Sequence, residues 1–273
     1  MAVVDARAGK AHADNARTNK ATQLLGRFGM ACYGVVHLLV AWLAIQVAFG
    51  ESEQADQKGA VGKLAETPVG PVLLWGLAIG LFAYAVWQVL LAVSGYDWVD
   101  KKRKRTFRKI GAASRAVITA ALGVYTIRLA TGSGGGGSSN ETSQEWTAKL
   151  MALPFGPWLV GIVALFIIGV GFASVRRGVK KKFLEDLNQG QLPQVATPLG
   201  IAGHCAKGVG YGIIGVLLGF AAIDAQPGEA VGLDGALKTL QAQTFGSVLL
   251  VLVGLGFAAF GAYCLVAARA HKG

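Results

Sequence analysis

Long apolar runs separated by short polar segments dominate this chain. Six runs can be traced: Leu24–Phe49, Val69–Ser94, Ile110–Ala130, Phe155–Val175, Gly200–Ile223 and Phe245–Ala268. An apolar run of about 18 residues or more is long enough to cross the core of a bilayer as a helix. Backbone groups in lipid must hydrogen-bond to one another, so we expect helices in these runs. The predicted fold class is therefore all-α: a polytopic membrane protein with six transmembrane helices.

A short phrase built around proline and glycine recurs at the start of the second, fourth and sixth runs. Its members are Pro68, Gly70 and Pro71, then Pro154, Gly156 and Pro157, and finally Thr244, Gly246 and Ser247. Proline is well tolerated in the first turn of a helix, and glycine allows a tight turn. We interpret the phrase as a structural corner that turns the chain into the membrane. The third copy lacks both prolines, which leaves its corner geometry open.

The stretch before each corner has apolar residues at helical spacing. These stretches read "GAVGKLAE", "SQEWTAKLMA" and "GLDGALKTLQAQ", and each predicts a short amphipathic helix at the outer interface. A unit of helix, outer loop and helix contains two spans, so the three copies are parallel repeats about an axis along the membrane normal. We expect a pseudo-threefold ring, with a two-plus-two-plus-two arrangement that lacks a true axis as the alternative.

These patterns divide the chain into three repeats with basic loops between them. The predicted segments are a mobile cytoplasmic tail at 1–23, repeats at 24–95, 110–178 and 200–268, basic cytoplasmic loops at 96–109 and 179–199, and a C-terminal tail at 269–273. The first, third and fifth runs also align with one another. The matching residues are Gly26 and Tyr33, then Gly111 and Ile118, then His204 and Tyr211.

The triplicated pair of spans, with its Leu-x3-Pro-x-Gly-Pro corner and this Gly/Tyr pattern, resembles the bacterial membrane family called domain of unknown function 1206. The resemblance covers the chain from about Leu24 to Ala268. It implies a three-repeat, six-span bacterial protein and brings no established activity or catalytic residue. We therefore expect a multi-pass protein of a bacterial cytoplasmic membrane.

The net charge of +11 is unevenly distributed. Lys and Arg concentrate in the N-terminal segment, the second and fourth loops and the C-terminal segment, together with their adjoining helix ends. By the positive-inside rule both termini are then cytoplasmic. The stretches Lys101–Lys109 and Arg176–Lys182 are interpreted as topology signals that can also bind anionic lipid headgroups. Nucleic-acid binding is not expected, because no aromatic-rich platform accompanies the charges.

Polar residues inside the predicted spans are the places to look for function. His37 lies near the middle of the first run, and the alignment above pairs it with Leu122 and Gly215, so it is not part of the shared scaffold. The other candidates for pore or polar-contact residues are Gln46, Gln88 and Arg128. A ligand, relay or gating role for His37 competes with a plain hydrogen bond between helices.

Motifs for catalysis or cofactor binding are absent from the sequence. The three cysteines form no CxxC pair, and there is no Ser/His/Asp set, HExxH or P-loop. His37 and His204 are predicted at depths too different for one haem iron to join them. We therefore expect no enzyme activity, no metal and no cofactor.

Three functions remain compatible with these patterns. The first is a non-enzymatic scaffold or accessory subunit of a membrane complex, suggested by the glycine-rich spans and the lack of reactive groups. The second is a small-solute transporter or channel around the pseudo-threefold axis, and the third is a cofactor-bearing redox subunit. Membrane lipids and possible membrane-protein partners are the expected binding partners.

Overall fold

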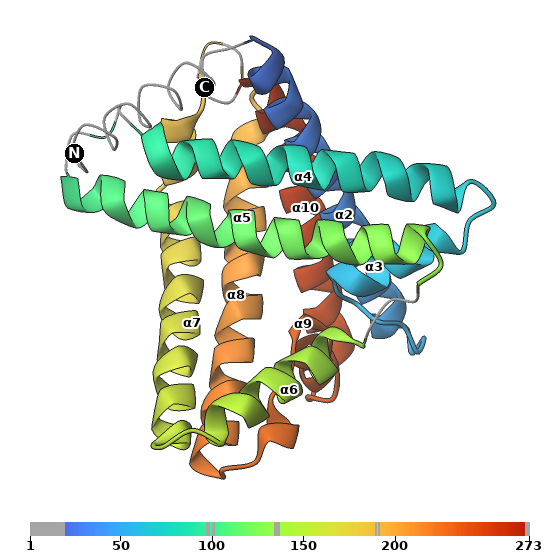
Figure 1. Ribbon diagram of the computed structural model, residues 1–273, viewed down its shortest axis with the longest axis vertical. Coiled ribbons are helices and arrows are strands. Elements are labelled where there is room, and N and C mark those ends of the chain that lie inside the picture. The colour runs from blue at the N-terminus through green and yellow to red at the C-terminus, as the bar shows by residue number, and fades with distance from the viewer. Residues whose placement is uncertain are drawn as a thin grey trace.

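The computed structural model describes residues 20–96, 99, 102–133, 137–188, 190 and 192–270. Most of the predicted N-terminal tail, together with residues 271–273, lies outside that part. The described chain is all-helical (Figure 1). Its elements are α2 (Lys20–Ala48), α3 (Gln57–Ala65), α4 (Gly70–Ser94), α5 (Lys102–Ala130), α6 (Ser139–Met151), α7 (Gly156–Val179), η1 (Lys182–Asp186), α8 (Ala196–Ile223), η3 (Pro227–Glu229), α9 (Leu233–Gln241) and α10 (Gly246–Ala270). Six of these helices, α2, α4, α5, α7, α8 and α10, are long and apolar enough to cross a membrane.

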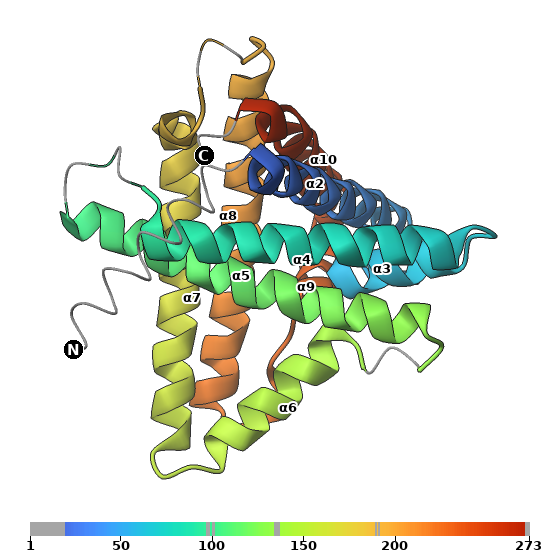
Figure 2. The same ribbon diagram turned by 45° about the horizontal axis from the view of Figure 1, so that its top comes forward.

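The spanning helices form three antiparallel pairs, and each pair joins two different repeats. The most extensive packing is between α4 and α5, between α7 and α8, and between α10 and α2. Each pair therefore combines the second spanning helix of one repeat with the first spanning helix of the next. The pair α4 and α5 lies across α7 and α8 in both views (Figures 1 and 2). The two spanning helices of one repeat are thus not each other's closest neighbours, although α4 with α5 and α7 with α8 are consecutive along the chain.

The ring of six helices is closed on five of its six sides. Within the first repeat α2 packs along α4, and within the third repeat α8 packs along α10. The equivalent helices of the second repeat, α5 and α7, do not pack along each other over the part that the structure describes. The contacts therefore form an open series that runs from α5 through α4, α2, α10 and α8 to α7, and they do not establish the threefold axis expected from the sequence.

Glycine contacts establish the structural register of the repeats. A Cβ atom on Gly34 of α2 would lie 2.8 Å from the carbonyl oxygen of Gly261, and one on Gly208 of α8 would lie 2.7 Å from that of Gly171. These two close approaches are equivalent, so Gly34 corresponds to Gly208. The buried residues of α5 fix its register as well, because Ala112, Ala116 and Thr119 then correspond to the buried Met30, Gly34 and His37 of α2. His37 therefore corresponds to Thr119 and Tyr211. The sequence alignment that paired His37 with Leu122 and Gly215 is wrong, because the glycine spacing that it used was three or four residues out of step with the helix contacts.

The three corners share one glycine contact, although the backbone before it differs: φ is positive at Phe155 and Phe245, at 63° and 68°, and −98° at Val69. Gly70, Gly156 and Gly246 each donate a backbone hydrogen bond of 2.7–2.8 Å to the carbonyl three residues earlier. A Cβ atom at these positions would collide with the backbone of the preceding short helix, at 1.9 Å from the Gln241 oxygen in the third copy. The replacement of both prolines by Thr244 and Ser247 therefore leaves that corner intact, since glycine is what the close approach requires.

The short helices close the end of the bundle where the corners lie, here called the corner end. Val61 of α3 and Leu237 of α9 are fully buried in a large apolar cluster that includes Leu43, Leu81 and Leu250 of the spans. Beside it, the buried carboxylate of Asp234 accepts hydrogen bonds from the Ala55 backbone and the Asn140 side chain. This polar contact links the corner-end loops of all three repeats.

Candidate functional site at the bundle axis

Three equivalent positions, one from each repeat, lie in or beside aromatic side chains between the spanning helices. In the register set by the glycines, Tyr33 of α2 corresponds to Arg115 of α5 and to Lys207 of α8. Each lies in the middle third of its helix. We call Tyr33, Arg115 and Lys207 the axial residues. Two of the three are cations within spanning helices, so this position is chemically unlike the apolar scaffold around it.

The ammonium group of Lys207 is enclosed by aromatic rings. Its Nζ lies 4.1 Å from the ring centre of Phe260, 5.4 Å from that of Tyr33 and 5.9 Å from that of Tyr211. It donates one hydrogen bond, of 3.2 Å, to the hydroxyl of Tyr33. A lysine at the centre of a membrane helix costs about 2.5–3.5 kcal/mol, and a cation–π contact offsets about 0.5–2 kcal/mol. The rings therefore stabilise the cation without neutralising it.

Arg115 is held by neutral partners. Its Nε lies 3.4 Å from Oε1 of Gln88, and one of its terminal nitrogens donates to the hydroxyl of Tyr96 at 3.2 Å. Tyr84 of α4 stacks on Tyr33 with ring centres 5.1 Å apart, which places aromatic groups between the two cations. Within the described chain, neither Arg115 nor Lys207 forms an ion pair with a carboxylate. The axis thus carries two positive charges with no fixed counter-charge in contact.

The two histidines of the spans border the same cluster. Nδ1 of His37 is 2.9 Å from the carbonyl oxygen of Tyr33, and Nδ1 of His204 is 2.8 Å from that of Gly200. Their rings lie 4.8 Å and 5.5 Å from that of Phe260. Each histidine is therefore satisfied by its own helix, and Phe260 contacts both. Nor do the described residues contain a group of three or more His, Cys, Asp or Glu side chains that could hold a metal ion.

Acidic residues gather at the other end of the bundle, here called the basic end, where α5 begins and α7 ends. The buried carboxylate of Asp186 in η1 pairs with both Arg108 of α5 and Arg177 of α7, and Glu185 pairs with Arg108. We call this group the Asp186 cluster. It joins α5 to α7, the two helices that do not pack along each other. Part of the basic charge in both predicted loops is therefore used inside the protein.

Other basic side chains of these loops are exposed. They include Lys102 and Arg103 at the start of α5, and Lys180 and Lys181 after α7. The neighbouring guanidinium of Arg176 lowers the pKa of Lys182, which shows how crowded the positive charge is. Lys101 lies outside the described residues.

Two of the four candidates from the sequence lie near the axis and two do not. His37 and Gln88 are buried and contact the axial residues Tyr33 and Arg115. Gln46 bonds Glu51 at 2.8 Å and Arg128 is exposed, both near the corner end. Sequence reasoning missed Arg115 and Lys207 because it counted them with the basic loops. The equivalence of positions 33, 115 and 207 was the signal that could have found them.

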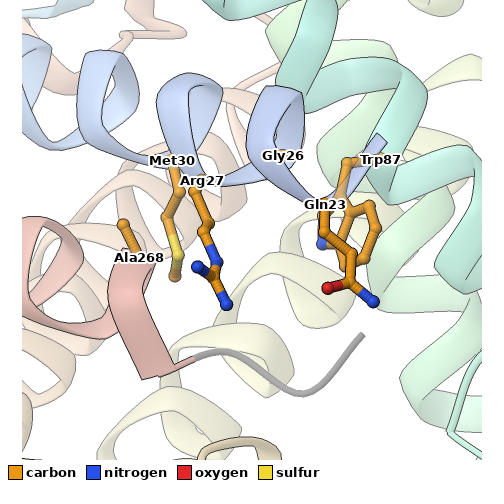
Figure 3. A pocket seen from close by; sticks show the side chains of 6 residues that line it. All are labelled: Gln23, Gly26, Arg27, Met30, Trp87 and Ala268. Atoms are coloured by element: carbon orange, nitrogen blue, oxygen red, sulfur yellow. The ribbon is translucent and has the colours of Figure 1, made fainter. Parts of the chain in front are cut away.

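A shallow pocket lies at the basic end between α2, α4 and α10. Gln23 and Arg27 of α2 turn their polar groups to the same side, beside Trp87 of α4 and Ala268 of α10 (Figure 3). Gly26 allows Trp87 to press against α2, since a Cβ atom there would lie 2.7 Å from the indole. None of the three axial residues lines this pocket.

Comparison with known proteins adds a family but no activity. The model of the family described as Domain of Unknown Function (DUF1206) matches residues 28–95, 110–181 and 202–271. Each match begins five residues before an axial residue, in agreement with the structural register. The chain is 30% identical over 245 residues to the Bacillus subtilis (strain 168) protein named Uncharacterized protein YxxB, covering 88% of each chain. No solved structure matches.

Proposed function

Because the chain belongs to the Domain of Unknown Function (DUF1206) family of three-repeat proteins, which names no activity, we propose a function from the axial site: the protein binds an anion among its helices and transports it, without catalysing a reaction. The observation that carries this proposal is the pair of axial cations, Arg115 and Lys207, held by neutral groups only. An ionisable group inside a membrane bundle costs free energy, and such groups are typical of substrate pathways.

The alternative of a scaffold for partner helices has less support. Its motive was the abundance of glycine in the spans, which allows another helix to approach closely. Gly34, Gly261, Gly171 and Gly208 form such approaches inside the chain, where a Cβ atom would lie 2.7–2.8 Å from a facing carbonyl oxygen. These glycines therefore need no outside partner to explain them. The described residues offer no specific observation in favour of a redox subunit: the rings of His37 and His204 both pack against Phe260.

The proposed orientation places the basic end in the cytoplasm of a bacterium. The exposed cations that flank α5 and α7 at that end support it through the positive-inside rule, and they are also suited to anionic lipid headgroups. Labelling of intact cells with a membrane-impermeant maleimide tests the orientation. We expect Ser133→Cys, at the corner end, to react and Arg103→Cys, at the basic end, to be protected; the reverse pattern contradicts the orientation.

Anion binding is tested with the purified protein in a non-ionic detergent. We expect acetate or inorganic phosphate to raise the thermal unfolding midpoint of the wild type, and Lys207→Met to lose at least ten-fold in apparent affinity because the uncompensated charge is gone. Arg128→Met is the matched control, since it also removes a cation from a spanning helix but at the exposed corner end. An equal loss in both variants, or no response in the wild type, would contradict the proposal.

A further inference from the structure

The open side of the ring coincides with a difference at one position of the repeat. Within the first repeat, Gly80 lets α4 approach α2, since a Cβ atom would lie 2.3 Å from Sγ of Cys32; within the third, Gly256 does the same against Ala206. The equivalent residue of the second repeat is Phe166, which is 63% exposed. The second repeat therefore lacks the glycine that allows the spanning helices of the other two repeats to approach closely.

Exposure of the neighbouring positions shows that this side is uncovered. Val170 of α7 is 39% exposed, whereas its equivalents Tyr84 and Phe260 are 5% and 7% exposed. Ile118 of α5 is 59% exposed, whereas its equivalent Val36 is completely buried. We call the face formed by Ser114, Ile118, Phe166 and Val170 the open side. It is apolar apart from one serine hydroxyl, which bonds the carbonyl of its own helix at 3.1 Å.

A cation lies at the edge of this apolar face. Gly29 and Gly203 are pressed against Tyr84 and Phe260, but their equivalent on α5, Gly111, meets nothing within 4 Å except its own Arg115. The Nη1 atom of Arg115 would lie 3.7 Å from a Cβ atom on Gly111. The guanidinium of Arg115 therefore lies over Gly111, whereas a neighbouring helix covers the equivalent glycine in the other two repeats. The Arg115 side chain is half-buried.

From this arrangement we propose that the anion is amphipathic and reaches the axial cations from the bilayer through the open side. Its carboxylate or phosphate head would bind Arg115, with Lys207 deeper in the bundle. Its alkyl chain would lie along Ile118, Phe166 and Val170. An apolar face beside an uncompensated cation matches an alkyl anion in both charge and polarity, whereas a hydrophilic anion would leave the apolar face unused.

This inference rests on the proposed anion site and narrows its ligand. Each buried methylene contributes about 0.8 kcal/mol, or nearly four-fold in affinity. We therefore expect oleate to bind the purified protein in maltoside at least ten-fold more tightly than acetate, and at least ten-fold more tightly than oleyl alcohol, which lacks the charge. Phosphatidylglycerol is compared with oleate to tell a lipid headgroup from a free fatty acid, and tight binding of either one supports the proposal.

Variants separate the open side from the cation. Phe166→Gly places in α7 the glycine that allows α4 to pack on α2 and α10 to pack on α8. We therefore expect this variant to lose the preference for oleate over acetate, while acetate still raises its unfolding midpoint. Leu165→Gly is the matched control, because Leu165 and its equivalents Ile79 and Leu255 are all exposed. Ile118→Trp offers a second test, since its bulk fills the open side from α5.

The outcomes distinguish the two proposals. If no anion binds the wild type, the anion site itself is wrong. If acetate binds as tightly as oleate, or if Phe166→Gly and Ile118→Trp both behave as Leu165→Gly does, the anion site stands and the open side is not its route. Native mass spectrometry reads bound ligand directly, and the unfolding midpoint of each variant shows that it is folded.

Discussion

At the scale of single residues, the axial position shows how one site in a repeat can diverge while its backbone does not. Tyr33, Arg115 and Lys207 occupy equivalent places on three helices, yet one supplies a hydroxyl and two supply positive charge. The hydroxyl of Tyr33 accepts the single hydrogen bond of Lys207. The three copies therefore contribute different chemical groups at one equivalent position.

Removal of that hydroxyl tests the contact. We expect Tyr33→Phe to lower the free energy of unfolding in mixed micelles by about 0.5–1.5 kcal/mol, because the ammonium group loses its hydrogen-bond partner. Tyr125→Phe is the control, since Tyr125 is half-buried and its hydroxyl bonds no described side chain. Equal stability of the two variants would show that the hydrogen bond contributes nothing.

The helix pairs depend on glycine at the element scale. Gly171 of α7 and Gly208 of α8 bring two backbones together, and their would-be Cβ atoms lie 2.8 Å and 2.7 Å from the facing oxygens. We expect Gly208→Ala to destabilise the protein by about 1–3 kcal/mol, since overpacking forces the backbones apart. Reversible unfolding in mixed micelles measures the change.

Another glycine on α8 supplies the control for this prediction. Gly212 has no neighbour within 4 Å of its would-be Cβ atom. Gly212→Ala should therefore be neutral or stabilising by up to about 1 kcal/mol, through helix propensity alone. If Gly208→Ala were as stable as Gly212→Ala, the close approach of α7 and α8 would not be a source of stability.

For the whole molecule, the second repeat is held by charge where the other two are held by packing. The helices α5 and α7 do not pack along each other over the described residues, and the Asp186 cluster joins their basic ends instead. A buried carboxylate between two guanidinium groups is difficult to replace, because its removal leaves two cations facing each other. The open side is thus bounded by ion pairs at the basic end.

Loss of this carboxylate should loosen one side of the bundle only. We expect Asp186→Ala to cost about 3 kcal/mol and to increase amide hydrogen exchange in η1 and at the start of α5, with α2 and α10 unchanged. Glu145→Ala removes an exposed carboxylate paired only with Lys149 and serves as the control. Uniform exchange across all helices would contradict a local role for the Asp186 cluster.

Much of the architecture could be read from local patterns. Six apolar runs, three corners and three short helices follow from hydrophobic periodicity and from proline and glycine placed at fixed offsets. These features are confirmed because each depends on residues close together in the chain. The family assignment is confirmed for the same reason, since its motifs lie within each repeat. The sequence also placed His37 inside the first span, although it paired His37 with the wrong residues of the other two repeats.

What the tertiary structure decided is how the repeats meet. The register of Tyr33 with Arg115 and Lys207 depends on which residues are buried across repeats. A register error of three or four residues keeps the same face of a helix but moves each residue by about one turn, roughly 5 Å, along it. The open side depends on the absence of packing between α5 and α7, which local periodicity does not encode. Six spans are thus a property of the sequence itself, whereas the two cations at the axis and the open side beside them arise only when the helices pack.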